Sequence, residues 1–99
     1  MVNMYEHKIY VPTVYALIID QLRTGMAEAH GGCSRILVHG SWKSDDLDIC
    51  SEPVAMYSCI TSYRTRPDAM SVAANALLAA GEECVLYTCQ EVHAEFINE

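Results

Sequence analysis

The stretch Gly31–Tyr63 constrains the fold of this chain more than any other, because it holds two strand-like runs separated by a polar link. The first run is Ser34–Trp42, the second is Pro53–Tyr63, and Lys43–Glu52 lies between them. A polar, acidic segment between two apolar runs is typical of a turn. We therefore predict that the two runs form the central hairpin of a small sheet.

The second run also permits a helical interpretation, since Ser51-Glu52-Pro53 resembles a helix start. A helix would present an apolar stripe made of Met56, Cys59, Ile60 and Tyr63. The composition favours a strand, because the run is rich in β-branched and aromatic residues. Proline at the first position of a strand removes no central ladder hydrogen bond. We predict a strand here.

The segment before the hairpin predicts a strand and then a helix. Met4–Val11 alternates, with His7 and Ile9 on one face and Lys8 on the other. Pro12 stops this strand and suits the first turn of a helix. The helix carries an apolar stripe at helical spacing and continues past Gly25, and His30-Gly31-Gly32 ends it. The stripe consists of Val14, Leu17, Ile18 and Leu22.

The segment after the hairpin predicts a second helix and a last strand. Thr65-Arg66-Pro67-Asp68 is a helix start, and Met70–Ala80 is rich in alanine and leucine, which are strong helix formers. Gly81 closes this helix, and Glu83–Gln90 is the last strand, followed by a continuation or a short tail strand. The expected buried side of the helix is Ala69, Val72, Ala73, Ala76, Leu77 and Ala80.

The predicted order of elements is strand, helix, strand, strand, helix, strand over a single α+β domain, residues 1–99. Two right-handed βαβ crossovers joined by a hairpin make a ferredoxin-like βαββαβ fold. We expect a four-stranded antiparallel sheet with two helices on one face. The other face is then open to water or to a partner.

The net charge of −7 bears on the partners of the protein. We expect no nucleic-acid ligand, because binding to phosphate needs lysine and arginine. An acidic surface suits a basic protein partner, plain solubility, or mimicry of a nucleic acid. The N-terminus lacks the features of a signal peptide and no apolar run is long enough to cross a membrane, so we expect a cytoplasmic protein.

The five cysteines form neither a CxxC pair nor an even set, so we expect no disulfide framework and no zinc site. The four histidines match no recognised metal site, although His7 and His93 become neighbours if the first and last strands pair. Satisfied surface histidines are the simpler interpretation. We therefore predict no metal and no cofactor.

Three short motifs carry a resemblance. They are KIYVPT (Lys8–Thr13), GGCSRILVHGSW (Gly31–Trp42), and EPVAMYSCI (Glu52–Ile60) with GEECVLY (Gly81–Tyr87). Together they resemble a loose group of small bacteriophage and bacterial proteins with the plan VPT, GG-small-T, G-x-W, EP-strand and G-[QE]-E-x-V-L-Y. This chain has Ser34 where the group tends to have threonine. The resemblance implies the same fold and a phage source, and it implies no catalytic residue.

Two polar groupings allow a functional and a structural interpretation. Gly31-Gly32 is a helix C-cap or, alternatively, an anion-binding nest of backbone N–H groups. His39, Ser41 and Lys43 form a candidate catalytic set with Asp45 or Asp46, but nucleophilic catalysis needs a base and an orienting group in contact. Exposed polar residues beside a hairpin explain the same pattern. We predict no catalytic residue.

The candidates for ligand or partner binding are aromatic and basic residues. Tyrosine and tryptophan are enriched at protein interfaces, although they also fill cores. Arginines that cluster hold small anions, and otherwise they pair with local acids. The candidate set is Arg35, His39, Trp42, Tyr57, Tyr63, Arg64 and Arg66.

Two functional hypotheses follow. The first is a small, acidic, phage-encoded, non-enzymatic protein that forms a homodimer and uses the open sheet face to bind, and in one version inhibit, a host protein. The alternative is a dimer that binds a small ligand or nucleotide, or an enzyme, with a site near Ser34–Trp42 lined by Arg35, His39 and Trp42. A structural role in a virion is a third hypothesis.

Overall fold

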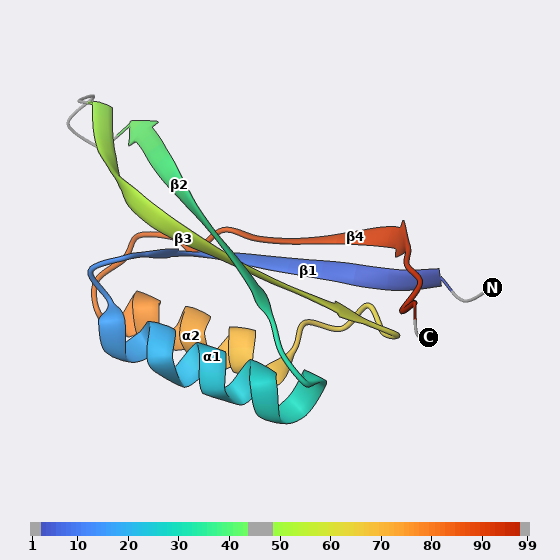
Figure 1. Ribbon diagram of the computed structural model, residues 1–99. Coiled ribbons are helices and arrows are strands. Elements are labelled where there is room, and N and C mark those ends of the chain that lie inside the picture. Colours follow the sequence, from blue (N-terminus) through green and yellow to red (C-terminus); the bar gives the residue numbers. More distant parts are fainter. Residues whose placement is uncertain (1–2, 44–48, 98–99) are drawn as a thin grey trace.

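The computed structural model describes residues 3–43 and 49–97. Its sheet contains four antiparallel strands in the order β2-β3-β1-β4, and both helices cover the same face (Figure 1). This arrangement confirms the predicted ferredoxin-like fold. The elements are β1 (Asn3–Pro12), α1 (Ala16–His30), β2 (Ser34–Lys43), β3 (Ile49–Thr61), α2 (Asp68–Ala79) and β4 (Tyr87–His93).

The second run of the hairpin is a strand, as the β-branched and aromatic residues indicated. The ladder is longer than predicted, because Lys43 pairs with Ile49 and Gly40 pairs with Glu52. Lys43 and residues 49–52 therefore belong to the strands and not to the link. Pairing satisfies their backbone groups, which a polar composition alone does not reveal. Asp45 and Asp46 lie outside the described residues.

The core lies between the sheet and the helices. On β1, the predicted face of His7, Ile9 and Val11 is fully buried. The strand β3 adds Ala55, Tyr57 and Cys59 from the same face, since Cys59 pairs with His7 and Tyr57 with Ile9. The helices contribute Leu22, Met26, Met70, Ala73 and Leu77.

The buried faces of the helices differ from the prediction. Helix α1 begins at Ala16, because Pro12 ends β1 and does not enter the helix. Leu22 and Met26 are buried one turn apart, whereas Val14 and Leu17 are 76% and 71% exposed. On α2, Met70 is buried and Val72 is 60% exposed. Apolar periodicity alone does not decide which side of an alanine-rich helix turns toward the sheet.

The last strand begins at Tyr87, four residues later than Glu83, and ends at His93. Among the described strands, β4 pairs with β1 alone, and the register ends where Ile9 faces Tyr87. Beyond that pair, Tyr10 N–H donates one hydrogen bond to the Leu86 carbonyl at 3.1 Å. The segment 81–86 is therefore free to depart from the sheet, and Gly81 with φ 107° starts it.

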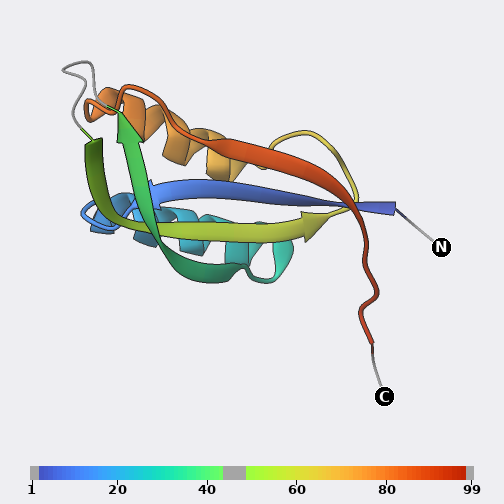
Figure 2. The same cartoon turned by 90° about the horizontal axis from the view of Figure 1, so that it is seen from above.

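The hairpin of β2 and β3 rises from the sheet on the side away from the helices (Figure 1). Seen from above, it curves toward the segment that joins α2 to β4 (Figure 2). The molecule is elongated, with principal extents of 52 × 23 × 23 Å. This curvature places the distal hairpin beside residues 81–86, which are distant from it in sequence.

Candidate binding groove on the open face

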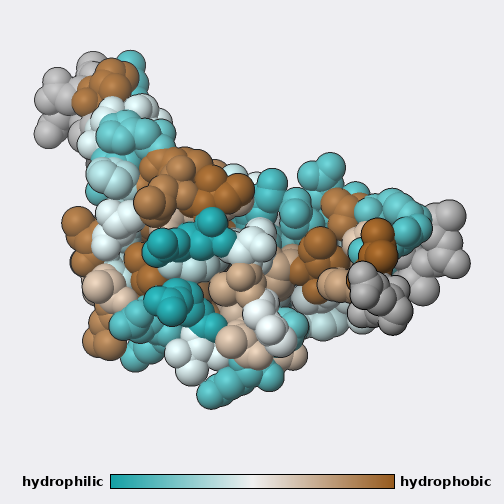
Figure 3. Space-filling model, viewed as in Figure 1, coloured by the Kyte–Doolittle hydropathy of each residue, from teal (hydrophilic) through white to brown (hydrophobic). Residues whose placement is uncertain are grey.

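The uncovered face of the sheet is apolar beside the hairpin. Ile36 is 55% exposed and Val38 is 37% exposed on β2, while Val54 and Met56 behind them on β3 are nearly buried. Apolar surface gathers where the hairpin leaves the sheet (Figure 3). Because β2 is an edge strand, its outer backbone groups are also unpaired within this sheet.

A groove of about 600 Å³ lies between the distal hairpin and the segment 81–86. Gly40 lines it, and a Cβ atom added there would lie 3.0 Å from Val54 Cγ2. The ladder continues past Gly40 without a bulge, so the close approach explains this glycine. The lining consists of Tyr10, Pro12, Val38, His39, Gly40, Ser41, Glu52, Val54, Gly81, Glu82, Glu83, Cys84 and Leu86.

The charged residues that line the groove are acidic. Glu52 comes from the hairpin side, and Glu82 and Glu83 come from the opposite wall, whereas no lysine or arginine among the described residues lines it. The Tyr15 hydroxyl donates to Glu82 Oε2 at 2.9 Å and so helps to orient this carboxylate. The hydrogen bond to Glu82 is the main cause that raises the pKa of Tyr15, and the charge of Glu52 adds to it. The two acidic walls thus act on one hydroxyl.

Of the sequence-predicted binding residues on β2, His39 lines the groove. Arg35 is exposed at the strand edge opposite Tyr57, and it makes no ion pair within the described part of the chain. Trp42 pairs with Cys50 in the ladder, and its side chain lies outside what the structure describes. Of the three residues proposed to line a site near Ser34–Trp42, His39 is therefore the one that the structure places in the groove.

Tyr57 is a correction, because it is only 1% exposed and belongs to the core. Its position on β3 places it on the helix-covered face, where it cannot reach a partner on the open face. Successive side chains of a strand point to opposite faces of the sheet, and the sequence pattern did not show which of the two faces of β3 the helices cover.

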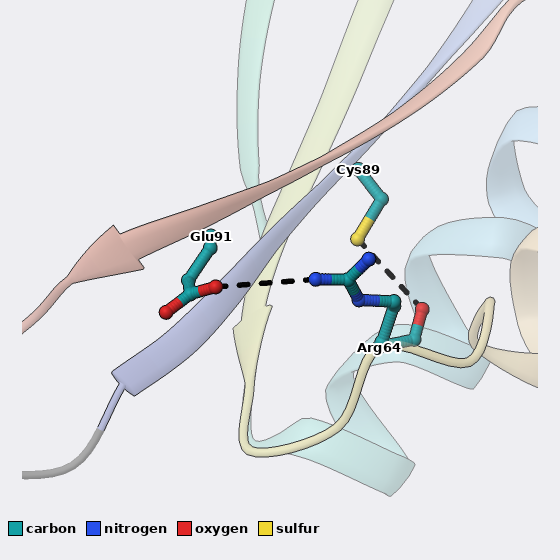
Figure 4. Close-up of polar contacts among 3 residues, drawn as sticks. All are labelled: Arg64, Cys89 and Glu91. Atoms are coloured by element: carbon teal, nitrogen blue, oxygen red, sulfur yellow. Dashed lines mark hydrogen bonds and ion pairs between the residues drawn. The ribbon is translucent and has the colours of Figure 1, made fainter.

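The other predicted binding residues follow β3 and lie near the opposite edge of the sheet. Arg64 pairs with Glu91 of β4 at 3.9 Å, and its carbonyl accepts from Cys89 Sγ at 3.7 Å (Figure 4). The Arg66 guanidinium lies 5.4 Å from the centre of the Tyr87 ring. Since Arg35 is on the other edge strand, the three arginines do not cluster around one anion.

Ser41 and the glycine pair have structural roles here. The Ser41 hydroxyl lies 2.8 Å from the Ser51 hydroxyl, its partner across the hairpin. Gly31 is the C-cap of α1 in the left-handed conformation with φ 78°, and its N–H donates to the Ala27 carbonyl. This observation agrees with the C-cap interpretation of Gly31-Gly32.

The buried His7 is the polar feature that sequence reasoning missed. Tyr87 Oη lies 2.6 Å from His7 Nδ1, and the Tyr63 carbonyl and Thr61 Oγ1 lie 3.0 Å and 2.8 Å from Nε2. A neutral ring that accepts from Tyr87 and donates to the Tyr63 carbonyl satisfies both nitrogens. Desolvation by burial lowers the pKa of His7, consistent with that neutral form.

His7 is therefore not a surface histidine, and it does not lie opposite His93. The first and last strands do pair, but the register places Cys89 opposite His7 and Asn3 opposite His93. Within residues 3–43 and 49–97, no group of three or more histidine, cysteine, aspartate or glutamate residues is arranged to hold a metal ion. No helix in the same ranges is long and apolar enough to span a membrane.

Comparison with known proteins supports the fold. No family model and no curated protein sequence matches this chain. Among solved structures, the B. subtilis GlnK–ATP complex is similar with a TM-score of 0.66 and 14% identity, over 93% of this chain and 84% of that chain. A Bacillus cereus protein related to NIF3 is similar with a TM-score of 0.61 and 13% identity, over 94% of this chain but 26% of that chain.

Proposed function

We propose that this chain is a small, non-enzymatic interaction protein that binds another protein through the open face of its sheet. The observation that carries the proposal is the uncovered apolar surface beside the groove, where Ile36, Val38 and Leu86 are 55%, 37% and 56% exposed. Protein interfaces combine such an apolar centre with a polar rim. Contiguous exposed apolar surface is also a recognised mark of interaction sites.

The net charge of the protein indicates the charge of the partner surface. A net charge of −7 attracts a basic surface and repels nucleic-acid phosphate. In keeping with the motifs shared with small phage proteins, we propose a phage origin and a host protein as the partner, which binding would inhibit. The cytoplasm of the host is the proposed location.

Self-association through β2 is part of the proposal. The edge strand β2 carries Ile36, Leu37 and Val38 in succession, all exposed, and exposed apolar edge strands pair readily with other chains. We propose a homodimer on this ground. A mass measurement by light scattering on the size-exclusion peak tests it, and a monomer at all accessible concentrations would refute it.

A small-ligand function is the second candidate, and the similarity to a GlnK–ATP complex favours it. Its site would be the same groove. The chemistry of the lining opposes a nucleotide, because Glu52, Glu82 and Glu83 would repel the phosphates. A thermal shift with ATP tests this candidate, since a ligand that binds the folded state raises the melting temperature.

The main test is capture of a partner by surface variants. The double variant Ile36→Asp with Val38→Asp places charges on the open face, and Leu17→Asp with Val72→Asp places the same charges on exposed helix positions. We expect wild-type and helix-variant protein to capture the same partner from a bacterial host lysate and the open-face variant to lose it. No reproducible partner, or capture that is insensitive to the open-face variant, would refute the proposed function.

A further inference from the structure

We propose that the groove binds a lysine or arginine side chain carried by an apolar segment of the partner protein. This inference rests on the proposed function and deepens it, because it assigns one part of the open face to one kind of side chain. It combines a cavity of about 600 Å³, three acidic residues on its walls that are in no ion pair within the described residues, and the apolar surface that continues from it.

Acidic residues come from both sides of the groove. Glu52 extends from β3, and Glu82 and Glu83 belong to the segment on the other side of the groove. Within the described residues, none of these three carboxylates is in an ion pair, whereas Glu6, Asp20 and Glu91 each pair with a lysine or arginine of the chain. The groove thus retains negative charge that a partner can neutralise.

The other lining residues suit the stem of a long basic side chain. Tyr10, Pro12, Val38, Val54 and Leu86 are the larger apolar residues of the lining. Lysine and arginine bury their methylene stems along apolar surface while the charged head stays at a polar site. An aliphatic stem along these residues leaves the charged head free to contact an acidic residue of the same groove.

The surface next to the groove indicates a polypeptide and not an isolated cation. Val38 lines the groove, and Ile36, two residues before it on the same face of β2, is not among the lining residues. A small cation would leave this apolar strip uncovered. In a segment with apolar residues on either side of a basic one, the apolar residues cover the strip and the basic side chain fills the groove.

The test uses a fluorescein-labelled peptide of alternating lysine and valine, with an alternating glutamate and valine peptide as the comparison. The groove variant is Glu52→Gln with Glu83→Gln, which leaves the Tyr15–Glu82 hydrogen bond intact. The control variant is Asp20→Asn with Glu28→Gln on the exposed side of α1, which removes the same charge. Fluorescence anisotropy measures the affinity at low and high salt.

We expect the lysine peptide to bind wild-type and control protein alike, to bind the groove variant roughly tenfold more weakly, and to lose affinity as salt rises. The glutamate peptide should not bind. Equal affinity for the groove and control variants overturns the inference, and so does equal binding of the two peptides or the absence of binding to wild-type protein.

The same variants separate this inference from the proposed function. If the groove variant captures the partner with unchanged affinity while the open-face variant Ile36→Asp with Val38→Asp loses it, the groove inference fails and the proposed function stands. If neither variant affects capture, both fail. Loss of capture by both variants, with the control unchanged, supports both.

Discussion

Two polar regions lie on opposite faces of the same sheet, and they differ in how their hydrogen-bonding groups are satisfied. On the helix-covered face, His7 is fully buried and both ring nitrogens have partners within 3.0 Å. On the open face, Glu52, Glu82 and Glu83 line a groove and have no cationic partner within the described chain.

The difference separates residues that stabilise the fold from residues that remain available for binding. A buried polar group with every partner in place contributes to a unique packed state, and removing one partner leaves another unsatisfied. A solvated carboxylate on a groove wall contributes little to folding. We therefore expect substitutions at His7 to change stability and substitutions in the groove to change binding.

The largest effect is expected for His7→Ala. The change removes the ring between the Tyr87 hydroxyl and the Tyr63 carbonyl and leaves a cavity in the core. We expect the free energy of unfolding to fall by about 3 kcal/mol, measured by urea denaturation. His39→Ala, at an exposed site, is the control and should change stability by less than about 0.5 kcal/mol. Equal stabilities of the two variants would contradict the structural role of His7.

A smaller loss is expected for Tyr87→Phe. The variant keeps the ring but removes the hydroxyl that donates to His7 Nδ1 at 2.6 Å, so this nitrogen loses its partner. We expect a loss of about 1–2 kcal/mol in the same denaturation experiment. Tyr63→Phe removes a hydroxyl whose nearest contact is an exposed one to His30 at 3.3 Å, and it should cost less than Tyr87→Phe. The reverse order would show that the Tyr87 hydroxyl does not satisfy His7.

The pH dependence of stability provides a third test. Burial lowers the pKa of His7 below its ordinary value of 6.5 in the folded state, so the unfolded chain binds this proton first as the pH falls. The contribution of His7 to stability is therefore complete above pH 6.5, and it decreases between that pH and the lower folded-state pKa.

Stability curves from pH 8 to pH 5 for wild-type protein and His7→Gln check this sign. The difference between the two curves should shrink as the pH falls, because the variant has no group to protonate at this position. Carboxylates titrate in both proteins and cancel in the difference. A difference that is constant or grows toward acidic pH would contradict a neutral buried His7.

The smallest effect on stability is expected for Glu52→Gln with Glu83→Gln. The two carboxylates are not paired in the described structure, and their removal reduces the repulsion within an acidic groove. We expect the free energy of unfolding to change by less than about 0.5 kcal/mol in urea denaturation. A large loss would show that the acidic walls stabilise the fold, and it would remove the contrast with His7.

Much of the fold was predictable because its signals are local. Alternation identified β1 as a strand with His7 and Ile9 on one face, β-branched residues identified β3 as a strand, and Gly31 marked the end of α1. The strand boundaries and helix orientations that were predicted wrongly depend on contacts between residues distant in sequence. Val72 was expected to be buried in an alanine-rich helix, but the packing of α2 against α1 and the sheet buries Met70 instead.

The candidate site was predictable only in outline. The open face followed from the order of elements, and His39 was placed near the site. The acidic residues of the groove were missed, because Glu52 was assigned to a link, Glu83 was assigned to the start of a strand and Glu82 was assigned to no element. The acidic residues that follow Gly81 in the sequence could have indicated the groove, since Gly81 and Gly40 both line it.

By itself, the sequence determined the order of the strands and helices, because periodicity and turn residues act over short stretches of chain, and the fixed handedness of crossovers placed both helices on one face of the sheet. Only the tertiary structure decided that His7 is buried opposite Cys89 and that the hairpin curves toward residues 81–86. Strand register and sheet curvature arise from pairing between distant segments, and these two features produce the internal polar network and the acidic groove.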